Sequence, residues 1–249
     1  MYQFFIEDEN AAEDFVTIEG SDVNHIKNVL RMRPGEKIRV CTRNGQNYFC
    51  SISDITESFV RADILEKEAE STELPCRIYL FQGLPKNDKM EWIIQKTVEL
   101  GVYEVIPVAM KSCVVKLDDK KAKSKVTRWQ AIAESAAKQS KRSLIPEVKM
   151  PMSYKEAVAY AKKLDVKLVP YENEHGMAGT KAAMEQIKKG ESIAVFIGPE
   201  GGFAPEEIAL VQDEMQLISL GKRILRTETA GIAALAILGY QLESSDMIE

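Results

Sequence analysis

The feature that most constrains this chain is an apolar run at residues 193–197 that ends directly in Gly-Pro-Glu-Gly-Gly at residues 198–202. Five consecutive apolar residues are typical of a parallel strand buried on both faces. Three glycines in the next five residues let the backbone approach a ligand closely. Pro205, followed by two glutamates, favours the start of a helix. Strand, glycine loop and helix together predict an α/β protein with a ligand site at the carboxyl end of a strand.

A second loop of this kind lies at residues 220–230, where Leu-Gly-Lys-Arg-Ile-Leu-Arg-Thr-Glu-Thr-Ala precedes an apolar stretch. The chain has no G-x-G-x-x-G, no Walker A lysine and no G-x-S-x-G. These absences exclude the ordinary dinucleotide-binding, P-loop and serine-hydrolase sites. The two loops therefore serve another ligand, or the glycines serve only tight turns.

Strand and helix patterns alternate through the C-terminal two thirds of the chain, which predicts a parallel sheet with helices on its faces. We expect strands at residues 77–81, 105–108, 166–169 and 193–197, and helices at 88–100, 121–141, 178–189 and 229–242. The last helix is apolar nearly all round. It should therefore be buried on most sides, in the core or at a subunit interface.

The N-terminal region reads instead as short strands with turns between them. We expect strands at residues 15–18, 37–41, 48–52 and 60–64, a hairpin at Asn44-Gly45, and one helix that Ser21 can cap. This pattern predicts a small β-barrel. A charged run at residues 66–73 marks the linker, so we expect domains at residues 1–70 and 74–249.

Charge and cysteine usage narrow the choice of partners. The net charge of −5 argues against indiscriminate nucleic-acid binding, but residues 111–149 hold eleven Lys or Arg against four Asp or Glu. That excess is either a solvated helix face or a nucleic-acid surface. Four cysteines without a C-x-x-C spacing, and only two histidines, indicate buried thiols and no metal site. With no secretory signal pattern and no apolar run long enough to cross a bilayer, we expect a cytoplasmic protein.

The two loops resemble the signature of the RsmE family, ribosomal RNA methyltransferases of the knotted SPOUT superfamily that modify N3 of a uridine in 16S rRNA. The resemblance extends to Trp-Ile-Ile-Gln-Lys-Thr-Val-Glu-Leu-Gly-Val at residues 92–102, to residues 134–142 and to residues 25–31, so it covers nearly the whole chain. It implies a C-terminal SPOUT-type parallel sheet with a trefoil knot and a PUA-like N-terminal barrel that binds RNA. The family commonly has Ser or Thr where this chain has Ala204, so the following helix lacks a hydroxyl N-cap.

The resemblance also implies that the C-terminal loops bind S-adenosyl-L-methionine. Loops at strand ends can offer backbone donors and acceptors to an adenine edge, and leucine or isoleucine side chains can supply an apolar floor. A carboxylate beside two glycines can bind ribose hydroxyls or a neighbouring arginine. We expect the cofactor to contact Pro170, Ile197, Gly198, Pro199, Glu200, Gly201, Gly202, Leu220, Gly221, Ile224, Leu225, Thr227, Thr229 and Ala230.

Methyl transfer to uridine N3 needs a lone pair that N3 gains only when its proton leaves. An arginine can stabilise the resulting charge on O2 and O4. Arg226 is the first candidate, and Arg142, which a partner subunit could supply, is the second. Glu228 is a possible base, although Arg226 and Glu228 could simply form a structural pair.

Several basic residues are candidates for RNA contact. We expect His25, Arg31, Lys111, Lys138 and Arg142 to contact RNA, although a lone histidine near an apolar face is more often structural. The implied partners are 16S rRNA, within the small ribosomal subunit, and a second copy of the chain. A non-catalytic RNA-binding protein, another nucleotide-binding enzyme and a methyltransferase for a different RNA base remain as alternatives.

Overall fold

A computed structural model describes residues 1–68 and 71–244 of the chain. The chain forms two compact units, one of Met1–Glu73 with Ala137–Ile145 and one of Leu74–Ala136 with Pro146–Glu249. We call them unit 1 and unit 2. Unit 1 thus contains a segment that returns to it from the middle of the sequence.

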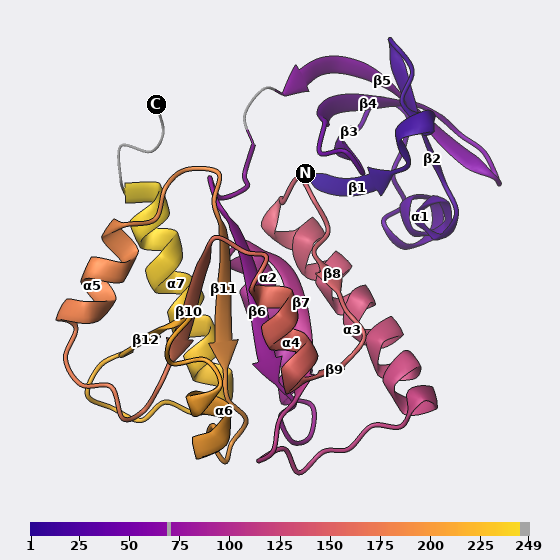
Figure 1. Ribbon diagram of the computed structural model, residues 1–249. Helices are drawn as coiled ribbons and strands as arrows, with labels where there is room; N and C mark the ends of the chain where they lie inside the picture. Colours follow the sequence, from indigo (N-terminus) through magenta and orange to yellow (C-terminus); the bar gives the residue numbers. More distant parts are fainter. Residues whose placement is uncertain (69–70, 245–249) are drawn as a thin grey trace. The chain divides into compact units, whose positions relative to one another are not determined.

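Unit 1 is built on a curled five-stranded sheet (Figure 1). Its strands are β1 (Tyr2–Ile6), β2 (Phe15–Glu19), β3 (Lys37–Thr42), β4 (Asn47–Ile55) and β5 (Phe59–Glu68), in the order β1-β3-β4-β5-β2. β1 pairs with β3 in parallel, and the other pairs are antiparallel. Alternate side chains from all five strands form one apolar core. The N-terminal barrel expected from the sequence is present as this curled sheet.

The helix of unit 1 does not begin as expected. α1 (Ser21–Asn24) has Gly20 at its N-cap with φ of 71°, and no side chain caps it, so Ser21 is already its first residue. A glycine adopts this backbone angle without the strain that a side chain would add. A π-helical turn, η2 (His25–Val29), follows α1, and Arg31 then takes a left-handed φ of 54°. A short 3-10 turn, η1 (Asp8–Asn10), links β1 to β2.

Unit 2 contains a seven-stranded sheet in which every pair is parallel. Its strands are β6 (Arg77–Gly83), β7 (Val102–Ala109), β8 (Glu147–Val148), β9 (Met152–Ser153), β10 (Val166–Pro170), β11 (Ser192–Ile197) and β12 (Gln216–Ile218). The order is β12-β10-β11-β6-β7-β8, with β9 also paired to β7. The parallel sheet predicted from the alternating pattern is confirmed.

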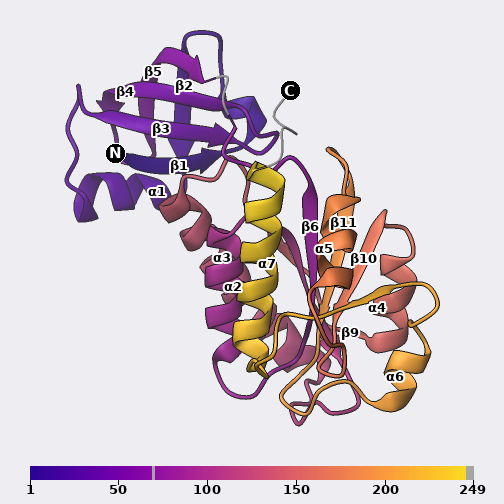
Figure 2. The same cartoon turned by 90° about the vertical axis from the view of Figure 1, so that its left-hand side faces the viewer.

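Helices cover both faces of this sheet (Figure 2). α2 (Lys89–Glu99), α3 (Asp119–Ser140) and α7 (Thr227–Ser244) lie on one side, and α4 (Tyr154–Ala161) and α6 (Pro205–Ala209) lie on the other. α5 (Ala178–Glu185) contacts α7 and β12. On the α4 side the rings of Phe81 and Phe196 stack 4.4 Å apart in the core.

α7 buries one face and exposes the other. Gly231, Leu235 and Leu238 are buried on it, whereas Tyr240 is 75% exposed. Among the described residues, no helix is long and apolar enough to cross a membrane. All four cysteines are free, and burial raises the pKa of both Cys41 and Cys50 to about 12.

Candidate active site

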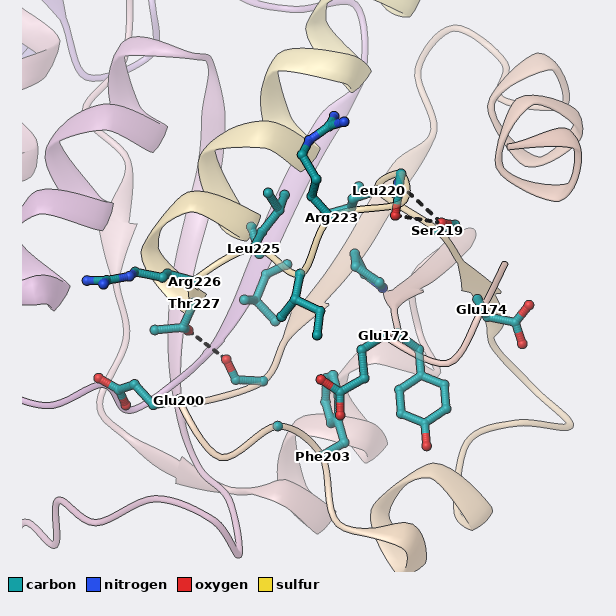
Figure 3. A pocket seen from close by; sticks show the side chains of 18 of the residues that line it. Glu172, Glu174, Glu200, Phe203, Ser219, Leu220, Arg223, Leu225, Arg226 and Thr227 are labelled. Atoms are coloured by element: carbon teal, nitrogen blue, oxygen red, sulfur yellow. Dashed lines mark hydrogen bonds between the residues drawn. The ribbon is translucent and has the colours of Figure 1, made fainter. Parts of the chain in front are cut away.

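A pocket of about 650 Å³ opens within unit 2 at the carboxyl ends of β10, β11 and β12. These strands are neighbours in the sheet, so the loops that follow them meet. The carboxyl ends of strands are where ligands bind in open α/β sheets. Figure 3 shows side chains from these loops facing a common space.

The structure gathers most of the expected cofactor residues around this pocket. Twelve of the fourteen line it, including Gly198, Glu200 and Gly202 from the first loop and Leu220, Leu225 and Thr227 from the second. The lining also includes residues that were not expected: Lys89, Tyr171, Glu172, Glu174, His175, Phe203, Ser219, Lys222 and Arg223. Most of these belong to the segment after β10 and to the middle of the second loop.

Gly201 and Thr229 do not line the pocket. A Cβ atom on Gly201 would lie 2.9 Å from the Cβ of Ser112, so this glycine is required by packing against the loop after β7. Gly202 behaves differently, because it lines the pocket and has a φ of 70°. Of these adjacent glycines, Gly201 therefore serves packing and Gly202 serves the backbone conformation at the pocket.

The first loop is tied to the start of α7 by a short hydrogen bond. The hydroxyl of Thr227 donates to the carbonyl oxygen of Gly198 at 2.6 Å, as drawn in Figure 3. Both residues line the pocket. The bond therefore fixes the distance between the two loops where the ligand would lie.

The second loop is held at its other end by a buried threonine. The N–H of Ser219 donates to the Thr180 hydroxyl at 3.0 Å, and that hydroxyl donates to the Ser219 carbonyl oxygen at 2.9 Å. The Ser219 hydroxyl in turn accepts the N–H of Gly221 at 3.2 Å. Both ends of the second loop are thus anchored, while Arg223, Ile224 and Arg226 between them are exposed.

One ammonium group joins two of the expected site carboxylates. Lys89 Nζ lies 3.1 Å from Glu200 Oε1 and 3.2 Å from Glu228 Oε2. The hydrogen bond with Glu200 is the main cause of a raised pKa for Lys89, and Glu228 adds to it. The structure therefore pairs Glu228 with Lys89, where the sequence had suggested Arg226 as the partner.

Glu200 is held as an ionised carboxylate. Burial acts to raise its pKa, but hydrogen bonds from the backbone N–H of Lys86 and of Glu200 itself, together with Lys89, outweigh it and lower the pKa. Lys86 N lies 3.0 Å from Glu200 Oε1. Glu200 thus fastens the glycine loop to the segment that precedes α2.

Arg226 lines the pocket and is exposed. Within the described chain its guanidinium forms no ion pair or hydrogen bond, and Figure 3 shows it at the same side of the view as Glu200. An unpaired arginine at the pocket wall is available to an anionic group on a ligand.

The Glu207 carboxylate supplies one half of a capping box at the start of α6, whereas Ala204 has no hydroxyl to supply the other half. Glu207 is buried, and its Oε2 accepts the N–H of Ala204 at 2.8 Å while its Oε1 accepts the N–H of Lys111 at 2.8 Å. The backbone N–H of the N-cap residue is therefore satisfied from within the first turn of α6. The same side chain fixes the loop after β7 that packs on Gly201.

Arg142 lies in unit 1 and is only 3% exposed. Its guanidinium forms a salt bridge with Glu73, and its Nε lies 3.1 Å from Glu73 Oε2. The Gln3 side chain donates to the Arg142 carbonyl oxygen at 2.6 Å, and the Ser143 N–H donates to Glu73 Oε1 at 2.8 Å. These contacts give Arg142 a role in holding the segment 137–145 to the rest of unit 1.

The other expected RNA contacts differ in their exposure. Lys138 pairs with Asp22 at 3.0 Å inside unit 1, and Lys111 pairs with Glu206 on the surface of unit 2. His25 and Arg31 are both exposed on unit 1. Of the five expected residues, His25, Arg31 and Lys111 are exposed, whereas Lys138 is half-buried and Arg142 is buried.

Family models match both parts of the chain. One described as an RNA methyltransferase domain matches residues 72–239, and one described as an RNA methyltransferase PUA domain matches residues 18–65. The first match alone covers more than half of the sequence.

Individual relatives agree with these models. The ribosomal RNA small subunit methyltransferase E of Bacillus subtilis is 39% identical, with 98% of each chain covered. The crystal structure of the protein of that name from Neisseria gonorrhoeae, bound to S-adenosyl methionine, matches with a TM-score of 0.82 at 33% identity over 96% of each chain. A putative methyltransferase from Legionella pneumophila with the same bound cofactor matches with a TM-score of 0.82 at 31% identity, over 95% of this chain and 96% of that one. This chain belongs to the ribosomal RNA small subunit methyltransferase E family, the RsmE family of RNA methyltransferases.

Proposed function

We propose that this protein transfers a methyl group from S-adenosyl-L-methionine to N3 of a specific uridine in 16S rRNA of the small ribosomal subunit. The observation that carries the proposal is the pocket lined by the two signature loops, with Arg226, which has no partner among the described residues, at its wall. The names and bound cofactor of the similar proteins support the same reaction class.

The residues around the pocket fit S-adenosyl-L-methionine. A volume of about 650 Å³ lies within the range of sites for ligands of this size. Gly198, Gly202 and Gly221 bring backbone to the pocket, and Ile197, Leu220 and Leu225 supply apolar surface for an adenine ring. Glu172 and Glu174 offer carboxylates to ribose hydroxyls or to an ammonium group. When bound, the cofactor supplies an electrophilic methyl group.

The protein must then favour the uridine form that has a lone pair on N3. We assign Arg226 to O2 or O4 of the uracil, where its planar guanidinium would stabilise the negative charge that appears as the N3 proton leaves. Arg226 is preferred to Arg142 because the Arg142 guanidinium is buried against Glu73. Most of the rate acceleration would come from holding N3 in line with the methyl group.

Glu228 is better suited to holding Lys89 than to removing the uridine proton. Its carboxylate is ion-paired with Lys89 and does not line the pocket. A proton-accepting role would require that ion pair to open. Solvent hydroxide or water at the exposed side of the pocket therefore remains the simpler proton acceptor.

The remaining parts of the proposal concern assembly and substrate binding. We assign residues 1–70 to RNA binding through a PUA-like domain and residues 74–249 to a knotted SPOUT methyltransferase domain. We also propose a cytoplasmic homodimer in which the exposed side of α7, with Tyr240, faces the partner. Sedimentation of active protein as a monomer at micromolar concentration would contradict the dimer.

Mass mapping of 16S rRNA nucleosides tests the reaction. Cells without this protein should lack one N3-methyluridine, and purified protein with the cofactor should restore it on small subunits or on the isolated RNA. Loss of a different methylated base would change the assigned target. An unchanged nucleoside map with RNA binding intact would favour a non-catalytic RNA-binding protein.

A further inference from the structure

Gln82 is a fully buried polar residue of unit 2. It lies at the carboxyl end of β6 and has no exposed surface. Its amide nitrogen donates to the Gly83 carbonyl oxygen at 3.0 Å and to the Thr227 hydroxyl oxygen at 2.9 Å. Its amide oxygen has no hydrogen-bond partner within the described residues. An apolar side chain would fill this place without leaving a polar atom unsatisfied, so packing alone does not explain a glutamine here.

The contacts determine which way the protons point. The Gly83 carbonyl can only accept, so the end of the Gln82 side chain that faces it must be the NH2 group. The Thr227 hydroxyl then accepts from Gln82, and its single hydrogen is left to donate to the Gly198 carbonyl oxygen at 2.6 Å. A directed chain of hydrogen bonds thus runs from β6 through the start of α7 to the glycine loop.

The backbone segments around these hydrogen bonds are packed closely at two glycines. A Cβ atom on Gly83 would lie 2.7 Å from the backbone nitrogen of Pro199, and one on Gly231 would lie 3.3 Å from Gln82 Oε1. β6, the glycine loop and α7 are therefore in close contact at this point. Gly198 and Thr227 both line the pocket, so a change in the hydrogen bonds that join β6, the glycine loop and α7 must move the pocket lining.

We propose that Gln82 is a positioning residue of the cofactor site, which acts through Thr227. By orienting the Thr227 hydroxyl toward Gly198, it holds the glycine loop against α7 in the geometry that binds the ligand before the ligand arrives. The inference rests on the proposed function for the identity of that ligand. The proposal explains why a polar amide, and not an apolar side chain, occupies this buried position.

Four variants separate hydrogen bonding from packing. Thr227→Val and Gln82→Met keep volume and remove the polar group, whereas Thr227→Ser keeps the hydroxyl. Thr97→Val is the matched control. Thr97 is as buried as Gln82, and its hydroxyl donates to the Ile93 carbonyl oxygen at 2.7 Å. Thr97 does not line the pocket. Binding of S-adenosyl-L-methionine and S-adenosylhomocysteine is measured by calorimetry, and thermal unfolding is followed in parallel.

We expect Thr227→Val to weaken binding by about tenfold and Gln82→Met by several-fold, since one directed hydrogen bond contributes on this scale. Thr227→Ser, which keeps the hydroxyl, should lose much less affinity than Thr227→Val. Thr97→Val should bind as the wild type does, even if it unfolds at a lower temperature. Combining Gln82→Met with Thr227→Val should add little, because the amide then has no hydroxyl to orient. Unchanged affinity in Gln82→Met, or equal losses in Thr227→Ser and Thr227→Val, would overturn the proposal.

Hydrogen exchange distinguishes this proposal from the proposed function. Without any ligand, Gln82→Met and Thr227→Val should speed amide exchange at residues 198–203, and Thr97→Val should not. If the wild type bound no S-adenosyl-L-methionine, the proposed function would fail while exchange still decided the role of Gln82. If amide exchange at residues 198–203 stayed at the wild-type rate in both variants, the positioning role of Gln82 would be refuted.

Discussion

At the scale of single residues, the site is organised by partners that are far apart in the sequence. Lys89 joins Glu200 and Glu228, which belong to different signature loops, and Gln82 reaches Thr227. The sequence made the glycines and Arg226 visible because they stand in recognisable loops. Lys89 and Gln82 lay in ordinary helix and strand patterns, so nothing local distinguished them.

Arg226→Lys tests the role of the guanidinium in catalysis. The variant keeps the charge but loses the planar fork, so turnover should fall on the order of 10²-fold while cofactor affinity changes little. The defect should shrink as pH rises toward the uridine pKa, because less help is then needed to form the anion. Single-turnover methyl transfer and calorimetry measure the two quantities. A loss confined to cofactor affinity would assign Arg226 to binding.

Glu200→Gln tests the charge state of the glycine loop. The pKa of Glu200 is lowered in the folded protein, so its ionised form adds stability that is present above its ordinary pKa of 4.5 and is lost as pH falls below that value. Wild type should therefore unfold at a higher temperature than Glu200→Gln at pH 7, and the gap should narrow on acidification through pH 4.5. Glu172→Gln, at a pocket carboxylate without an ion pair in the described chain, is the control. A gap that stays constant with pH would contradict the ion pair.

At the scale of elements, the sequence predicted the long and strongly patterned ones. The strands at β6, β10 and β11 and the helices at α2, α3 and α7 occur close to their expected ranges. β1, β8, β9 and α4 were missed. β8 and β9 have only two residues each, and β1 and β8 stand at a sheet edge. α4 did carry a signal, since Ser153 and Glu156 form a capping box at its start.

Glu206 and Glu207 are neighbours in α6 that should respond very differently to alanine. Glu207→Ala removes a buried carboxylate that accepts two backbone N–H groups, so we expect a loss of roughly 3 kcal/mol or more in the free energy of unfolding. Glu206 forms an exposed ion pair with Lys111, so Glu206→Ala should change stability little. Denaturant unfolding of the two variants provides the comparison. Equal losses would show that Glu207 does not anchor the loop after β7.

At the scale of the whole molecule, the sequence predicted an N-terminal β-structure, a C-terminal parallel α/β sheet and a ligand site at the ends of its strands. It could not predict that residues 137–145 belong with unit 1, because α3 reads as one continuous helix across that boundary. Nor could it show that Arg142 would be buried by Glu73, a contact that depends on tertiary folding. A contact between residues this far apart in the chain produces no local pattern in the sequence.

The basic surface of α3 should contribute to RNA binding through charge. Lys120 and Lys123 are exposed, so replacing both with Gln should make the slope of log affinity against log salt shallower by roughly 1.4 to 1.8 if each contacts a phosphate. Lys155→Gln with Lys163→Gln, exposed residues in and after α4, gives the same change in net charge elsewhere. Filter binding across a salt series measures both. Identical slopes for the two double variants would show that α3 presents only a solvated face.

The position of β6 between β7 and β11 has a consequence for synthesis of the protein. β7 follows β6 closely in the sequence, but β11 begins more than a hundred residues after β6 ends. While the ribosome makes the intervening chain, the β11 side of β6 keeps an apolar edge with unpaired N–H and C=O groups, the kind of edge that other chains can join. The nascent protein should therefore depend on chaperones until residue 197 has emerged. Because α7 completes the pocket, no ligand can assist any earlier step of folding.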